Sequence, residues 1–271
     1  MGLNINAVAL MASLEGHGGR MLTLGRQRIL FSAEQLERAL GAHVGGTLLD
    51  DAAVFRALGY SVVESVDVST YEGATHVIDL NVPLHRPDMF GAYDAVFTGG
   101  TLEHVFDVAQ ALRTTASLLK IGGRLIHVGP VNGWIDHGFY QLCPTWILDY
   151  FGANGWRVVS SALVDRMSDR EGKSVWRVRP AHHRRRVEGA KQLHFCVAER
   201  LESSTVDRNP IQSRYRRKFG EGEHDGAQIE FRAYDLVGGR AGEKKDGIDR
   251  RGRRWRRWFG GPWVGRKGGH D

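Results

Sequence analysis

The feature that most constrains the fold is the alternation of short apolar runs with helical patterns along the first 200 residues. Strands that alternate with helices favour a parallel sheet with crossover helices. We therefore predict an α/β fold. Strands are expected at 20–25, 61–68, 75–80, 93–98, 124–128, 157–164 and 192–199, and helices at 4–14, 32–40, 50–58, 107–120 and 144–152.

Two connections in this pattern are unusual. Only a few residues separate Asp67 from Thr75, whereas neighbouring parallel strands usually need a dozen or more connecting residues. The helix expected between these strands is therefore missing or reduced to a turn. The polar, arginine-rich stretch 166–186 suits an exposed hairpin connection at the edge of the sheet.

The composition is that of a globular protein, with 42% hydrophobic and 25% charged residues. No run of 18 apolar residues occurs, so we expect no membrane-spanning helix and a cytoplasmic location. The two cysteines, Cys143 and Cys196, cannot form a disulfide framework and match no zinc pattern. We therefore expect a reducing compartment and no metal.

Most of the net charge of +6 comes from the last 32 residues, where eleven lysines and arginines face four acidic residues. Arginines alternate there with Trp255, Trp258 and Trp263. This mixture suits an anionic membrane surface, such as the inner face of the cell membrane. The mixture is also compatible with binding to nucleic acid, which we favour least. A third alternative is a chain end without a defined partner. Residues 201–271 are polar and then basic, and we expect them to be largely irregular or disordered.

Two strands of the predicted sheet end in a carboxylate, Asp67 and Asp79. Open α/β sheets bind ligands at the carboxyl ends of their strands, where a carboxylate can accept hydrogen bonds from ribose hydroxyls or a base amino group. Alternatively, both residues cap loops, because Asp favours turns in any protein.

The region from Tyr93 to Pro130 carries a longer ordered pattern. A strand is followed by Leu102-Glu103-His104, a helix, and a Leu-Lys-Ile-Gly-Gly-Arg turn at 119–124 that leads into the next strand. This pattern resembles the class I S-adenosylmethionine-dependent methyltransferases, in particular the type 11 group. The resemblance covers roughly residues 20–200. It implies a methyltransferase-like domain over 1–200 with a Rossmann-like, mostly parallel seven-stranded sheet flanked by helices, whose final strand is antiparallel.

The resemblance also implies where S-adenosylmethionine binds. The ribose falls on Asp67 with Val68 beside the adenine, and the adenine amino group falls on Asp79 and Leu80. The remaining implied cofactor residues lie in two loops and at the helix start that follows the second loop: Gly25, Gln27, Gly99, Gly100, Thr101, Glu103 and His104. Glu103 and His104 alternatively serve only to start that helix.

One loop departs from the family pattern. The first strand normally runs into a loop with several glycines, whereas here Gly25 is followed by Arg26 and Gln27. Either the loop takes a different path and Gly25 with Gln27 still contacts the amino acid portion of the cofactor, or the site is degenerate.

The segment 132–141 lies where this family recognises its methyl acceptor. His137 could remove a proton from a hydroxyl, while Tyr140 and Asp136 orient the acceptor and Trp134 and Phe139 supply an apolar wall. The alternative is a loop whose aromatic residues cover the sheet. The sequence thus predicts methyl transfer to an oxygen or nitrogen of a small-molecule or sugar acceptor, with a non-catalytic binding or scaffold protein as the alternative.

Overall fold

The protein contains one twisted sheet with the strand order β3-β2-β1-β4-β5-β8-β6-β7. The computed structural model describes residues 2–44, 50–168, 174–180 and 191–219. The strands are β1 (Arg20–Leu24), β2 (Val62–Asp67), β3 (His76–Val77), β4 (Tyr93–Gly99), β5 (Leu119–Asn132), β6 (Arg157–Ser168), β7 (Ser174–Pro180) and β8 (Lys191–Glu199).

Strand direction divides the sheet into two parts. From β3 to β5 all neighbours are parallel, whereas β8 is antiparallel to both β5 and β6. The mostly parallel sheet with an antiparallel final strand is thus confirmed. An eighth strand, β7, pairs with β6 and lies within the stretch expected to form an edge hairpin.

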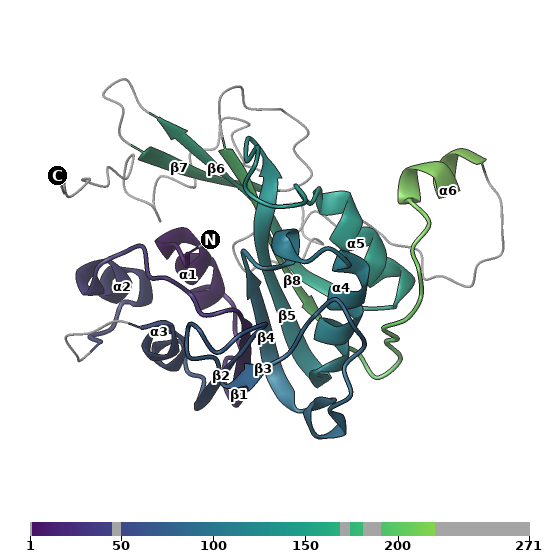
Figure 1. The fold of residues 1–271 in the computed structure, drawn as a ribbon. Coiled ribbons are helices and arrows are strands. Elements are labelled where there is room, and N and C mark those ends of the chain that lie inside the picture. Colours follow the sequence, from purple (N-terminus) through teal and green to yellow (C-terminus); the bar gives the residue numbers. More distant parts are fainter. Residues whose placement is uncertain (1, 45–49, 169–173, 181–190, 220–271) are drawn as a thin grey trace.

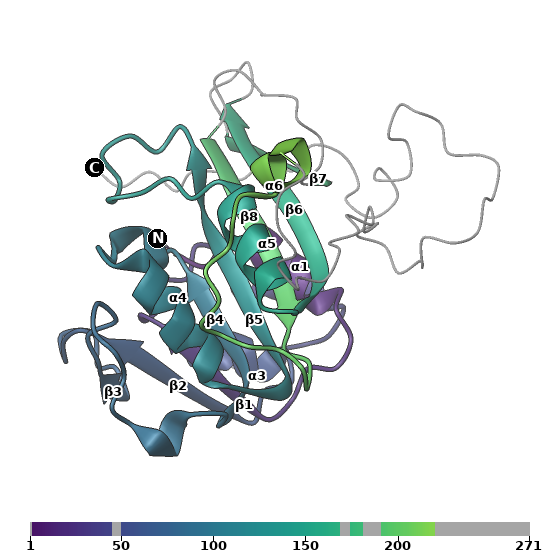
Figure 2. The same cartoon turned by 90° about the vertical axis from the view of Figure 1, so that its right-hand side faces the viewer.

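Helices cover both faces of the sheet (Figure 1). One face carries α1 (Ile5–Ala12), α2 (Ala33–Leu40) and α3 (Asp51–Ala57), and the other carries α4 (Val108–Ser117) and α5 (Pro144–Ala153). In Figure 2, α4 and α5 cross in front of the strands.

Alternate strand residues fill two separate cores, because successive side chains of a strand point to opposite faces. Leu22 and Leu24 of β1 join the core under α4 and α5, whereas Met21 joins the core under α1 to α3.

Local capping explains where several helices begin. Ser32 and Gln35 form the expected capping box at α2, and the side chain of Asp107 accepts a hydrogen bond from the backbone of Gln110 at α4. The predicted end of α4 at Lys120 is wrong. The helix ends at Ser117 because Leu119 already pairs with Tyr93 in the sheet, and Lys120 forms an ion pair with Asp94.

The short link between β2 and β3 contains no helix, as expected. The two strands are nevertheless parallel, with Asp67 opposite Val77. Paired hydrogen bonds between Ser65 and Thr75 close the turn, in which each backbone N–H binds the other residue's hydroxyl. β3 is much shorter than the predicted strand at 75–80.

The chain beyond β8 contains no helix or strand up to residue 212, but it is held against α5. Asn154, at the end of α5, binds this segment through both amide atoms, which contact Thr205 and Arg208. The segment then forms α6 (Ser213–Phe219), whose first backbone N–H donates to Asp149 of α5. The rest of the predicted extension, including the basic tail, lies outside the described residues. None of the helices in the described part of the chain is long and apolar enough to cross a membrane.

Candidate functional site

The carboxyl ends of β1, β2 and β4 meet at one edge of the sheet. Gly25, which follows β1, donates its backbone N–H to Val66 of β2 and has a φ of +73°. A Cβ at Gly25 would lie 3.4 Å from Thr101 Oγ1 and 3.9 Å from Asp67 Oδ2. The positive φ and this close approach explain why a glycine follows β1. Gly25, Asp67 and Thr101 therefore surround the same small space.

The end of β4 is fixed to its neighbours on both sides. Gly100 has a φ of +70° and donates its N–H to the carbonyl of Val128 on β5. The hydroxyl of Thr101 donates to the carbonyl of Leu24 on β1. Of the residues implied to bind cofactor in the two loops, the structure thus brings Gly25 and Thr101 together.

The departure from the glycine-rich pattern has a structural explanation. The Arg26 guanidinium turns toward α3, where it donates to both carboxylate oxygens of buried Asp51 over 2.8–3.1 Å. Asp51 also accepts the backbone N–H of Gln27. Arg26 is therefore held by α3, and its Nη1 also lies 3.5 Å from the carbonyl oxygen of Gly73 in the connection after β2.

Gln27 fills the space under the same loop. Its side chain is buried, and its Nε2 donates to the carbonyls of Leu24 and Gly25 over 3.3 and 3.4 Å. Its Oε1 has no hydrogen-bond partner among the described residues and lies 3.0 Å from the position of a Cβ on Gly99. The buried Gln27 side chain is thus hydrogen-bonded to the backbone of this loop.

Asp67, at the end of β2, and Asp79, two residues beyond β3, both form local turns, the alternative that the sequence left open. Asp67 Oδ1 accepts the N–H of Ser69, while its Oδ2 faces the Gly25 turn. Asp79 is engaged by Asn81, whose backbone and side-chain N–H groups both donate to Oδ1 over 2.8 Å. These hydrogen bonds lower the pKa of Asp79. Val68 is exposed and Leu80 is buried. Cofactor contact by Asp67, Val68, Asp79 and Leu80 stays a prediction.

A cluster of one carboxylate and two imidazoles begins at Glu103, two residues after Thr101. The short helix η2 (Leu102–His104) places the Glu103 carboxylate at 0% exposure, and neither carboxylate oxygen has a hydrogen-bond partner among the described residues. Burial raises the pKa of Glu103 to about 7.

Two histidines face this carboxylate. His137 Nε2 lies 3.8 Å and His104 Nε2 lies 4.0 Å from Glu103 Oε1. The two imidazole rings contact each other edge to face, with centroids 5.0 Å apart. Burial is the main cause that lowers the pKa of each histidine, which favours the neutral imidazole.

The predicted acceptor segment is tied to η2. The Tyr140 backbone N–H donates to the carbonyl of Glu103, and its hydroxyl donates to the carbonyl of Phe106 over 2.8 Å. Exposed Phe139 packs edge to face on exposed Phe106. Asp136, with a φ of +59°, turns the loop before His137. Tyr140 therefore positions the loop, and its expected catalytic role stays a prediction.

Sequence reasoning assigned these groups separately and missed the cluster. Glu103 and His104 were expected to bind cofactor and His137 to act as a base, with no metal. The available signal was the Leu102-Glu103-His104 triplet itself, because an adjacent carboxylate and imidazole are common metal ligands. Nothing in the sequence placed His137 beside them.

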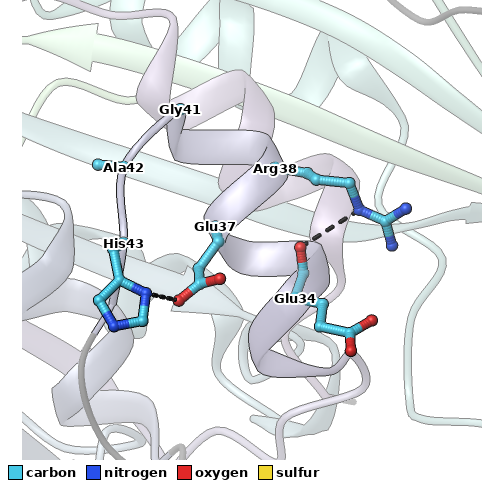
Figure 3. Close-up of a pocket in the computed structure, with 6 residues that line it drawn as sticks. All are labelled: Glu34, Glu37, Arg38, Gly41, Ala42 and His43. Atoms are coloured by element: carbon cyan, nitrogen blue, oxygen red, sulfur yellow. Dashed lines mark hydrogen bonds and ion pairs between the residues drawn. The ribbon is translucent and has the colours of Figure 1, made fainter.

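A surface hollow of about 470 Å³ lies elsewhere, at the end of α2 (Figure 3). His43 pairs with Glu37 over 2.5 Å, and Arg38 donates to the carbonyl of Glu34. These polar groups bind one another, and the hollow contains none of the predicted site residues. We assign it no functional role.

No family model matches the chain, and no curated protein matches it by sequence. Solved structures with a similar arrangement include the YcgJ protein of Bacillus subtilis, with 10% identity and a TM-score of 0.41 over 73% of this chain and 99% of that one. Another is a 1,6-didemethyltoxoflavin-N1-methyltransferase of Burkholderia thailandensis with bound S-adenosylhomocysteine, with 14% identity and a TM-score of 0.43 over 73% and 77% of the two chains.

The strand order, with β1 and β4 adjacent at the centre and β8 inserted antiparallel, defines the fold independently of these comparisons. It is a Rossmann-like α/β fold, with a mostly parallel sheet flanked by helices.

Proposed function

We propose that the protein is an S-adenosylmethionine-dependent methyltransferase that acts on an oxygen or nitrogen of a small-molecule or sugar acceptor. The observation that carries this proposal is the meeting of Gly25, Asp67 and Thr101 at the carboxyl ends of β1, β2 and β4. In a fold of this type, that edge is where a nucleoside ligand binds. The Asp67 carboxylate would accept hydrogen bonds from ribose hydroxyls.

The loops beyond β4 and β5 would hold the acceptor. Phe106 and Phe139 offer an exposed apolar surface there, next to the cluster of Glu103, His104 and His137. Methyl transfer would proceed by in-line attack of the acceptor on the sulfonium methyl, which proximity and orientation largely promote. A neutral His137 could take the proton that the acceptor loses.

A specific observation favours the second candidate, a scaffold without cofactor affinity. Gln27 stands where the family has a small residue that lets the backbone approach the cofactor closely, and its buried side chain is hydrogen-bonded to the loop. Whether the chain binds S-adenosylmethionine separates the two candidates.

The test is calorimetric titration of the full chain with S-adenosylmethionine and S-adenosylhomocysteine. For Asp67→Asn we expect affinity to fall about 10- to 100-fold, because charged hydrogen bonds to the ribose are replaced by weaker ones. Asp88→Asn is the matched control, since Asp88 is an exposed carboxylate paired with Arg86. A folded native chain without affinity for either compound would favour the scaffold.

A further inference from the structure

The cluster of Glu103, His104 and His137 has a geometry that the proposed methyl transfer does not require. One ligand atom from each residue lies within 4.8 Å of the other two. Two ligand atoms on a tetrahedral ion with bonds of about 2.1 Å lie about 3.4 Å apart. Small side-chain rotations would therefore bring all three atoms to coordinating distance.

The burial of Glu103 calls for a cation. A buried carboxylate is normally paired or hydrogen-bonded, because removing an unpaired charge from water is costly. Here both carboxylate oxygens and His137 Nε2 are buried without a hydrogen-bond partner among the described residues. Two of these unpartnered atoms, Glu103 Oε1 and His137 Nε2, lie 3.8 Å apart.

The backbone around the cluster is already fixed. The His104 N–H donates to the carbonyl of Thr101, and the Tyr140 N–H donates to that of Glu103. The Gly138 backbone packs so closely that a Cβ there would lie 2.8 Å from the Glu103 carbonyl oxygen. The Trp134 ring packs on His137, with centroids 5.1 Å apart. Such support holds ligands in place before an ion binds.

We propose that Glu103, His104 and His137 bind one divalent transition-metal ion. Two imidazoles and one carboxylate suit Zn²⁺, Fe²⁺ or Mn²⁺, whereas Mg²⁺ and Ca²⁺ prefer oxygen ligands throughout. Three protein ligands leave at least one coordination position open. With the ion bound, the His137 lone pair is coordinated, so the proton that the acceptor loses would pass to water and not to His137.

The open position suggests the chemical class of the acceptor, a step that rests on the proposed function. η2 begins directly after Thr101, which contacts the end of β1, so the ion would lie on the same edge of the sheet as the proposed cofactor site. An acceptor that presents a hydroxyl oxygen to the ion would be favoured over an amine that is protonated at neutral pH.

The test is calorimetric titration of the untagged full chain with Zn²⁺ after chelator treatment, without S-adenosylmethionine, and with Mg²⁺ as a comparison. We expect about one Zn²⁺ per chain. Glu103→Gln and His137→Asn should each weaken this binding at least 10-fold, whereas His43→Asn, which alters an exposed histidine beside Glu37, should not. Co²⁺ should give a visible absorption band in the native chain that Glu103→Gln lacks.

Equal Zn²⁺ affinity in the native chain and Glu103→Gln would overturn the proposal, as would the absence of saturable binding. Glu103→Gln preserves the size of the side chain and removes the buried charge, so circular dichroism should show an unchanged fold. S-Adenosylmethionine binding by the same variants is measured separately. A native chain that binds Zn²⁺ but not S-adenosylmethionine would contradict the proposed function alone, and a native chain that binds S-adenosylmethionine but not Zn²⁺ would contradict the metal site alone.

Discussion

At the scale of single residues, the turn after β1 depends on the absence of a side chain at Gly25. We expect Gly25→Ala to lower the free energy of unfolding by about 1–2 kcal/mol, because its φ of +73° is unfavourable for alanine. The new methyl group would also lie 3.4 Å from Thr101 Oγ1, in the proposed cofactor site, and should abolish measurable S-adenosylmethionine binding in calorimetry.

Gly41→Ala is the matched control for this prediction. Gly41 has a φ of +66° at the end of α2, and a Cβ there would meet no atom within 4 Å. Both variants should lose similar stability in thermal melts, but only Gly25→Ala should lose the cofactor. Equal binding by the two variants would show that the Gly25 turn does not face the ligand.

A further residue-scale prediction concerns the buried His194. Burial and the nearby His127 lower the pKa of His194 to about 3, whereas the unfolded chain has a value near 6.5. As the pH falls below about 6.5, the unfolded state takes up a proton that the folded state does not. His194 therefore makes the native state less stable by about 1.4 kcal/mol for each pH unit down to about pH 3.

His194→Gln should remove this dependence, and glutamine can still bind the hydroxyl of Ser161. The difference in unfolding free energy between the native chain and the variant, from denaturant titrations between pH 7 and 4, should change steadily with pH. His43→Gln, at an exposed position, should leave the pH dependence unchanged. Parallel curves for the native chain and His194→Gln would contradict the prediction.

At the scale of elements, α5 holds the segment that follows β8. Asn154 is buried and contacts Tyr150, Thr205 and Arg208 through its amide group. We expect Asn154→Ala to destabilise the protein by about 2 kcal/mol in chemical denaturation, because its buried amide makes several hydrogen bonds that are lost together. Asn209→Ala, on the exposed part of the same segment, should change stability by less than about 0.5 kcal/mol. Similar effects of both changes would mean that the amide contacts contribute little.

The elements also show what could be predicted from the sequence. Helix starts at Ser32, Asp50 and Asp107 were predictable, because a cap is a contact between residues three positions apart. The end of α4 was not, because pairing of Leu119 with Tyr93 decides it and that contact is distant in sequence. α6 was missed for the same reason, since its attachment to Asp149 is a long-range contact.

The candidate site was likewise predictable only in part. The resemblance placed Gly25 and Thr101 in one site, and the structure brings them together. The orientation of Arg26 toward Asp51 was not predictable, because Asp51 is on another element and had been interpreted only as part of a helix start. The approach of His137 to Glu103 depends on the path of the loop after β5, which no local pattern specifies.

At the scale of the whole molecule, the position of β8 has a consequence for how the protein is made. β8 lies between β5 and β6, and the two ladders that it forms join the parallel part of the sheet to the β6–β7 hairpin. Among the strands of the described residues, it is also the last to leave the ribosome. A nascent chain that stops before residue 191 therefore exposes one unpaired edge on β5 and another on β6, both open to association with other chains.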